Sequence, residues 1–162
     1  MEETIHDVRE TLKKRLEGKR VALVGIGNID KGDDGFGVQL IRRLKHRLTT
    51  TLLIEGGMSP ENYVGPLIKA YPEAVVLIDA AELRAEPAHT HIVEKSDIAA
   101  LGLSTHDVSL QLFIAYLEQS LNKADIFLLG TQPKNTQLGS EMSEELRQRL
   151  TYFETLFAEV LS

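Results

Sequence analysis

The chain has 162 residues, of which 43% are hydrophobic and 26% charged, a composition typical of one globular domain with a substantial core. Its net charge of −6 argues against a general binder of nucleic acids or anionic membranes. It contains no cysteine, which rules out disulfides and thiolate metal sites and agrees with a reducing cytoplasm. The N-terminus is too polar for a signal peptide, and no apolar run approaches the ~20 residues of a membrane span. We expect a cytoplasmic, single-domain protein over residues 1–162, monomeric because no long exposed apolar stripe is evident.

Hydrophobic periodicity predicts strands that alternate with helices. Such alternation favours a three-layer α/β/α sandwich with a mostly parallel five-stranded sheet. One strand, at residues 91–94, follows its predecessor after too few residues for a helical crossover, so we expect it to run antiparallel. The predicted strands are 20–25, 51–55, 74–78, 91–94 and 125–129, and the predicted helices are 3–16, 36–48, 60–71, 106–121 and 141–161.

The loop after the first strand is rich in glycine and aspartate. Gly25-Ile26-Gly27 begins like a dinucleotide fingerprint, but Asp30 stands where the third glycine belongs and would face a pyrophosphate, which disfavours a nucleotide site. Asp33 fits the N-cap of the next helix. Asp34 then lies in the first turn and faces the crevice outside the strand ends, where open α/β sheets bind ligands.

Other candidate residues follow strands on the same edge. Asp79 comes directly after the buried strand 74–78, where the alternative role is turn or helix capping. His106 begins a helix, and an imidazole with two carboxylates suits a divalent metal such as nickel or zinc; a capping or core histidine is the alternative. His89 and His91 form a weaker, spaced pair. Two glycine-containing turns offer backbone amides to an extended peptide or oxyanion, or are ordinary turns: Gly56-Gly57 and Gly130-Thr131-Gln132-Pro133.

Taken together, these pieces resemble the maturation endopeptidases of nickel–iron hydrogenases. The motifs occur in the family's order over about residues 20–135: Gly27-Asn28, Gly32-Asp33-Asp34-Gly35, Gly56-Gly57-Met58-Ser59-Pro60-Glu61-Asn62, Ile78-Asp79-Ala80, Ser104-Thr105-His106 and Gly130-Thr131-Gln132-Pro133. At position 34 the sequence has Asp, as in the branch that it most resembles, which matures energy-converting or formate-linked hydrogenases of the hydrogenase 3 type. Uptake-hydrogenase relatives carry Glu there. The N-terminal helix, residues 1–18, has no counterpart in the shortest relatives.

The resemblance implies an endopeptidase that clips a C-terminal extension from a [NiFe]-hydrogenase large-subunit precursor after nickel insertion. The family's catalytic and metal-contacting positions fall on Asp34, Asp79 and His106, which would sense nickel carried by the precursor; zinc or cadmium is expected to occupy the same ligands. Glu55 stands where the family often has Asp. With Gly56, Gly57 and Gln132 it is expected to bind substrate, while the loop is expected to be shaped by Gly27, Asn28, Gly32, Asp33 and Gly35.

Two other functions compete with this one. A receiver-like signalling domain would use magnesium and accept a phosphoryl group on Asp79, but Gln132 stands where such domains carry a lysine. A metal-dependent peptidase acting on other substrates is the remaining alternative.

Overall fold

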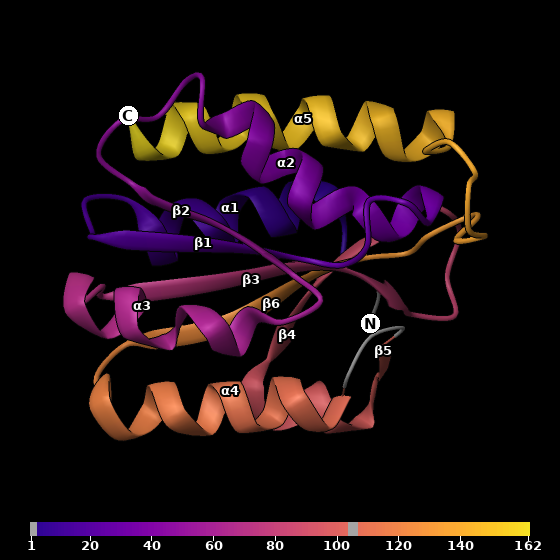
Figure 1. Ribbon diagram of the computed structural model, residues 1–162. Coiled ribbons are helices and arrows are strands. Elements are labelled where there is room, and N and C mark those ends of the chain that lie inside the picture. The colour runs from indigo at the N-terminus through magenta and orange to yellow at the C-terminus, as the bar shows by residue number, and fades with distance from the viewer. Residues whose placement is uncertain (1–2, 104–106) are drawn as a thin grey trace.

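The computed structural model describes residues 3–103 and 107–162, which form a mixed sheet between two layers of helices (Figure 1). The main sheet has the order β2-β1-β3-β6-β4. β1, β2, β3 and β6 are parallel, whereas β4 is antiparallel to β6, as predicted. A short β5 adds an antiparallel pair to the end of β3. The strands are β1 Val21–Ile26, β2 Leu52–Gly57, β3 Ala74–Glu82, β4 Thr90–Glu94, β5 Gly102–Leu103 and β6 Asp125–Thr131.

The helices cover both faces of this sheet. Figure 1 shows α1, α2 and α5 on one face and α3 and α4 on the other. The α-helices are α1 Ile5–Leu16, α2 Phe36–Leu44, α3 Val64–Ala70, α4 Asp107–Ser120 and α5 Glu144–Leu161, and the 3-10 helices are η1 Gly32–Gly35, η2 Pro60–Tyr63 and η3 Lys95–Ala100. None of the helices in the described ranges has the length and apolarity needed to cross a membrane.

Side-chain alternation divides the core into two clusters. Along β1, Leu23 packs toward α1, α2 and α5, and Val24 packs toward α3 and α4. In β3, Val76 and Leu77 divide in the same way. Because both faces are covered, the central strands read as nearly continuous apolar runs rather than as alternating ones.

Three strands run further than the sequence predicts. β3 continues to Glu82 instead of ending at residue 78, so Asp79 lies inside the strand and not after it. β2 takes in Gly56-Gly57, and β6 takes in Gly130-Thr131. Glycine and alanine have little intrinsic strand preference, but pairing with neighbouring strands carries the backbone on through them.

Helix ends also differ from the prediction. The predicted helix 60–71 divides into η2 and α3, and α2 ends four residues before residue 48. α5 begins at Glu144, because the Ser143 hydroxyl accepts a hydrogen bond from the backbone N of Leu146 and caps the helix there.

The N-terminal helix has a structural role that its sequence did not reveal. α1 begins at a capping box formed by Thr4 and Asp7. Just before it, Glu3 Oε1 accepts a hydrogen bond from the backbone N of Ile92 at 3.0 Å and pairs with His91 Nδ1 at 2.7 Å. Ile92 and His91 belong to β4, an edge strand of the sheet, so Glu3 satisfies a backbone donor that would otherwise face outward.

Candidate active site at the carboxyl edge of the sheet

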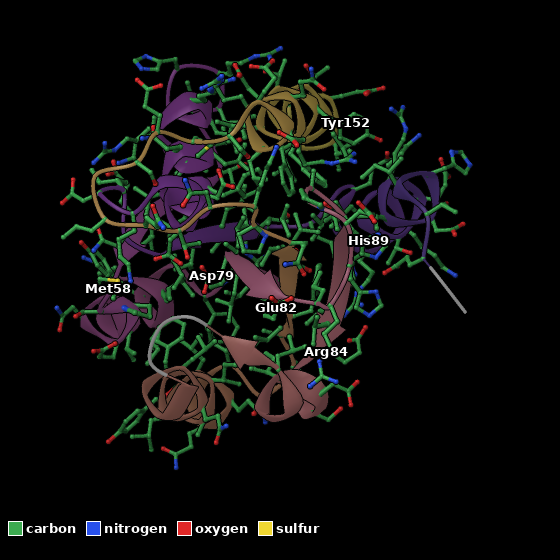
Figure 2. All side chains as sticks on the ribbon, turned by 90° about the vertical axis from the view of Figure 1, so that its right-hand side faces the viewer. Met58, Asp79, Glu82, Arg84, His89 and Tyr152 are labelled. Carbon is green, nitrogen blue, oxygen red and sulfur yellow. The ribbon has the colours of Figure 1, made fainter. Side chains whose placement is uncertain are left out.

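Asp79 lies at the carboxyl edge, by which we mean the end of the sheet where β1, β3 and β6 finish. It is fully buried and pairs in register with Gly130 of β6. Because side chains alternate along a strand, Asp79 shares the face of Leu77 and Ala81, which is the face covered by α3 and α4. Figure 2 looks onto this edge and shows Asp79 near its centre.

Asp34 reaches the same edge from the loop that follows β1. It lies in η1 and is fully buried. Its Oδ2 accepts a hydrogen bond from the backbone N of Asn28 at 2.9 Å, and Asn28 Oδ1 accepts one from the backbone N of Asp30 at 2.8 Å. Asn28 therefore folds the loop back on itself and holds the Asp34 carboxylate in place.

Gly27 is the backbone point on which both aspartates converge. Its φ of 125° suits glycine, and a Cβ there would overlap the carbonyl oxygen of Asp34 and lie 3.3 Å from Asp79 Oδ1. The Gly27 N donates to the carbonyl oxygen of Gly57 at 2.9 Å, which also joins the end of β2 to this point. Because Gly27 has no side chain, the Asp34 backbone and the Asp79 carboxylate can both lie against it.

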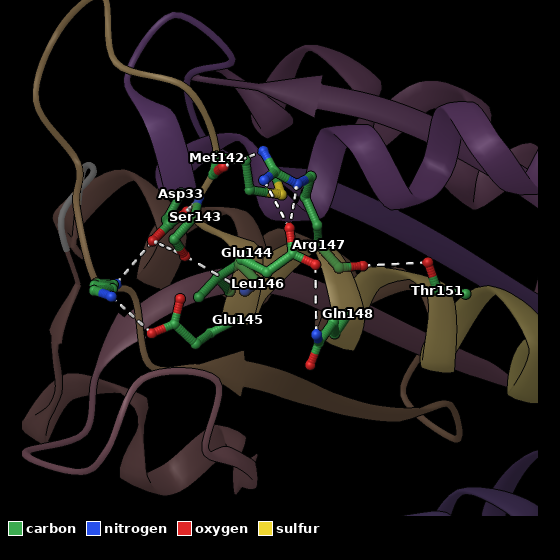
Figure 3. A network of polar contacts seen from close by, with 10 residues as sticks. Asp33, Met142, Ser143, Glu144, Glu145, Leu146, Arg147, Gln148 and Thr151 are labelled. Carbon is green, nitrogen blue, oxygen red and sulfur yellow. Dashed lines mark hydrogen bonds and ion pairs between the residues drawn. The ribbon is translucent and has the colours of Figure 1, made fainter.

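Asp33 does not cap the following helix, contrary to the sequence-based expectation. α2 starts at Phe36 without a side-chain cap. The fully buried Asp33 carboxylate instead accepts four hydrogen bonds from a distant part of the chain, and Figure 3 shows it beside Ser143. The donors are the backbone N of Lys134 (2.8 Å), of Asn135 (3.0 Å) and of Ser143 (2.7 Å), and the hydroxyl of Ser143 (2.9 Å).

These contacts make the acidic loop and the β6–α5 loop one unit. The backbone N of Asp33 donates to the carbonyl oxygen of Asn135 at 2.9 Å. Gly32 packs so closely that a Cβ would overlap the Ser140 hydroxyl. Gly35 closes the other side, where a Cβ would lie 2.9 Å from Ile29 Cα. Asp34 is thus held between residues that are fixed on both sides.

The predicted substrate-binding residues of β2 have different surroundings. The Glu55 carboxylate accepts hydrogen bonds from Lys45 Nζ at 2.8 Å and Arg42 Nε at 2.9 Å. These bonds, from Lys45 first and then Arg42, lower the pKa of Glu55 and keep it ionised. Gly56 packs against the carbonyl oxygen of Gly25, whereas the space beside Gly57 Cα is open. Of these three residues, Gly57 is the one beside which a substrate backbone has room.

Gln132 is buried and organises the connection between β3 and β4. Its Oε1 accepts a hydrogen bond from the backbone N of Leu83 at 2.7 Å, and its backbone N donates to the carbonyl oxygen of His89 at 2.8 Å. Gln132 therefore supports the loop 83–89 at the carboxyl edge through its own side chain.

His106, the predicted third ligand, lies outside the described residues. Leu103 pairs with Ala81, two residues beyond Asp79, and α4 begins at Asp107. Within residues 3–103 and 107–162, no group of three or more side chains could hold a metal ion. His89 and His91, the weaker candidate pair, therefore do not belong to such a group. The described part of the site therefore supplies two buried carboxylates, groups suited to metal coordination or to proton transfer.

Comparison with known proteins identifies the family of this site. A model of the hydrogenase maturation protease family (HycI) matches residues 38–159. The hydrogenase 3 maturation protease of Escherichia coli K12 is 28% identical over 113 residues, covering 68% of this chain and 71% of that protein. The crystal structure of a [NiFe] hydrogenase maturation protease HycI from Thermococcus kodakarensis superposes with a TM-score of 0.84 at 35% identity, covering 93% of this chain and 98% of that one.

The solution structure of the endopeptidase HycI from Escherichia coli has the same fold, with a TM-score of 0.76 at 24% identity over 84% of this chain and 87% of that one. These similarities remove the receiver-domain alternative. The chain belongs to the hydrogenase maturation protease family and is a hydrogenase maturation endopeptidase.

Proposed function

We propose that this endopeptidase removes a C-terminal extension from the large-subunit precursor of a [NiFe] hydrogenase after nickel has been inserted, acting as a cytoplasmic monomer. One observation carries the proposal: two fully buried aspartates from separate segments, Asp34 and Asp79, converge on Gly27 at the carboxyl edge. In α/β sheets this edge is where ligands bind.

In this proposal the nickel is part of the substrate. Asp34, Asp79 and His106 contact the metal that the precursor carries, and the precursor's own ligands complete the coordination shell. A two-carboxylate, one-imidazole set suits a borderline divalent ion and leaves positions open for ligands from the substrate. A precursor without nickel would lack this contact, so it would bind weakly and remain uncut. Added zinc or cadmium is able to occupy the same three ligands.

The proposed chemistry is hydrolysis of one peptide bond. The docked nickel orients the scissile peptide and polarises its carbonyl, while one aspartate accepts a proton from the attacking water. The hydroxide adds to the carbonyl carbon, the proton passes to the departing amide nitrogen, and the C–N bond breaks. The products are the mature C-terminus and the released extension.

The direct test incubates the purified protein with nickel-loaded and nickel-free precursor. We expect cleavage of the loaded form alone. The change in precursor mass measures this cleavage. Asp79→Asn and Asp34→Asn should each lower the cleavage rate by at least about a hundredfold, the scale of losing a catalytic acid–base group. Asp97→Asn, a change at an exposed acid on η3, is the matched control and should cut at the normal rate.

Two results would contradict parts of this proposal. Equal cleavage of the loaded and empty precursors would remove nickel sensing. A His106→Ala variant that cuts at the normal rate would remove the histidine from the ligand set, whatever the two aspartates do.

A further inference from the structure

A groove lies between the β3–β4 connection and the first half of α5. It has a volume of about 370 Å³ and is lined by Pro87, Ala88, Glu145, Gln148, Arg149 and Tyr152. We call it the Arg149 groove. None of these residues belongs to the carboxylate site, and no motif of the sequence pointed to them.

Arg149 is the unusual member of this groove. The side chain is half-buried, its Nε donates to the carbonyl oxygen of Ala88 at 3.1 Å, and its guanidinium carbon lies 5.6 Å from the ring centre of Tyr152. It makes no ion pair with any residue that the structure describes, and burial lowers its pKa. By contrast, Arg147 on the same helix pairs with Glu144 at 2.7 Å. A partly buried guanidinium without an anion is costly, and the arrangement favours a carboxylate from outside.

The acidic residue that lines the groove already has a partner. Glu145 lines the groove, but its carboxylate is paired with Lys134 Nζ at 2.8 Å, which offsets its charge. Arg149 therefore gives the groove its net positive character. A guanidinium binds a carboxylate through two parallel hydrogen bonds, and Tyr152 and Pro87 provide apolar walls beside it.

The groove continues the carboxyl edge. The backbone N of Ala88 donates to the carbonyl oxygen of Gln132 at 2.8 Å, so the groove wall is tied to the end of β6. The loop that carries Pro87 and Ala88 leaves β3, the strand of Asp79. In Figure 2, which looks onto the carboxyl edge, Tyr152 lies in the layer of α5 and Asp79 lies at the end of the sheet. A partner protein that covers the end of β6 would therefore lie next to the loop of Pro87 and Ala88, which forms one wall of the groove.

From this geometry we infer that the Arg149 groove is a docking site for an aspartate or glutamate side chain of the precursor protein, outside the cleavage site. The inference rests on the proposed function for the identity of the partner. A chain-terminal carboxylate is a poorer fit, because such groups are captured by free backbone amides. Here the amide of Ala88 donates to Gln132, that of His89 donates to the carbonyl oxygen of Glu86, and Pro87 has none.

The test measures both cleavage kinetics on nickel-loaded precursor and binding of nickel-free precursor. Arg149→Gln should raise KM and weaken binding by about tenfold with kcat unchanged, the loss expected for one charged contact at an interface. Arg149→Lys keeps the charge but not the paired hydrogen bonds, and should lie between. Arg147→Gln, on another side of α5, should match the wild type. Thermal midpoints confirm that each variant is folded.

Acid-to-amide changes in the precursor then identify the docking residue. The correct change should raise KM with the wild type and have no further effect with Arg149→Gln. Normal KM and binding for Arg149→Gln would overturn the proposal that the groove is a docking site, and would leave the proposed function intact. Wild-type binding that depends on Arg149 without any cleavage would overturn the proposed function and keep the groove. Arg149→Gln could raise KM while no acid-to-amide change in the precursor affects KM through Arg149. This result would overturn the proposal that an acidic side chain occupies the groove.

Discussion

The two ends of the sheet treat acidic side chains in opposite ways. At the amino end, Asp125 and Glu94 share one cation: Arg15 Nη2 lies 2.6 Å from Asp125 Oδ1, and Arg15 Nη1 lies 2.8 Å from Glu94 Oε2. The same guanidinium lies 4.0 Å above the ring of Phe127. At the carboxyl edge, Asp33 is fully buried and is held by backbone amides and a serine hydroxyl.

This difference separates stabilisation from function. At the amino end, the Arg15 cation balances the charges of Asp125 and Glu94 and links their two strands. Uncharged donors at the carboxyl edge fix a carboxylate in space without adding a positive charge. An edge built in this way suits the metal-bearing substrate that we propose for this site. The predictions below test each side of this contrast.

The largest effect is expected where the carboxyl edge leaves no space. Gly27→Ala would push a methyl group into the carbonyl oxygen of Asp34 at a φ that side chains avoid. We expect a loss of about 3 kcal/mol or more in the free energy of unfolding, together with loss of cleavage. Denaturant unfolding and precursor cleavage measure the two effects. Gly65→Ala is the control, because a Cβ there meets nothing within 4 Å. A Gly27→Ala protein as stable as the control would contradict the convergence at Gly27.

The next effect concerns the carboxylate that joins two loops. Asp33→Asn replaces an acceptor of four hydrogen bonds with an amide that places an NH₂ group against some of the same donors. We expect a loss of about 2–3 kcal/mol in urea unfolding. The kcat should also fall, because Asp34 is the neighbouring residue. Asp30→Asn, in an exposed part of the same loop, should change neither quantity. A reduced stability with unchanged kcat would show that Asp33 supports the fold without positioning Asp34.

The role of Asp33 shows what local sequence can and cannot predict. Its spacing before a helix made it a plausible N-cap, yet its partners Lys134 and Ser143 lie 101 and 110 residues later in the chain. No periodicity or motif encodes such a contact, because it arises only when β6 pairs with β3 and brings its following loop to the same edge. The same reasoning applies to Arg149, which local sequence presents as one more charged residue of an amphipathic helix.

By contrast, the features that depend on burial pattern were predictable. The apolar run of β3 predicts a buried strand, and the short connection before β4 predicts its antiparallel direction. The strand ends were wrong because hydrogen bonding to neighbours extends β3 through Ala80 and Ala81, residues with little strand preference of their own. The placement of Asp79 at the carboxyl edge survived this error, since the strand direction was right.

A smaller effect is expected at the amino end, and it should depend on pH. Arg15→Gln removes the shared cation and should lower stability by about 1 kcal/mol at pH 7, because the pairs are partly exposed. The hydrogen bond from Arg15 is the largest cause that lowers the pKa of Asp125 in the folded state. Its stabilisation is therefore fully present above the unfolded pKa of about 3.9 and is lost as the pH falls through the lower, folded pKa.

The measurement for Arg15 is the difference in unfolding free energy between wild type and variant across pH 2–7. The difference should be constant near neutrality and shrink below about pH 4. Arg9→Gln, which removes the looser pair with Glu159 at 3.4 Å, controls for the loss of a charge from α1. A gap that stays constant down to pH 2 would show that packing on Phe127, rather than the ion pair, is what Arg15 contributes.

The smallest effect on stability is expected at Lys134, where the contributions of the backbone and the side chain can be separated. Lys134 serves Asp33 through its backbone N, while its side chain forms a surface pair with Glu145 that raises the pKa of Lys134. Lys134→Gln removes the pair and keeps the backbone donor, so the urea midpoint should not change measurably, in contrast to Asp33→Asn. The side-chain pair is screened by salt, whereas the buried bond from the backbone N is screened much less. A Lys134→Gln variant that lost as much stability as Asp33→Asn would mean that the side-chain cation supports the buried carboxylate, and the contrast between the two ends would fail.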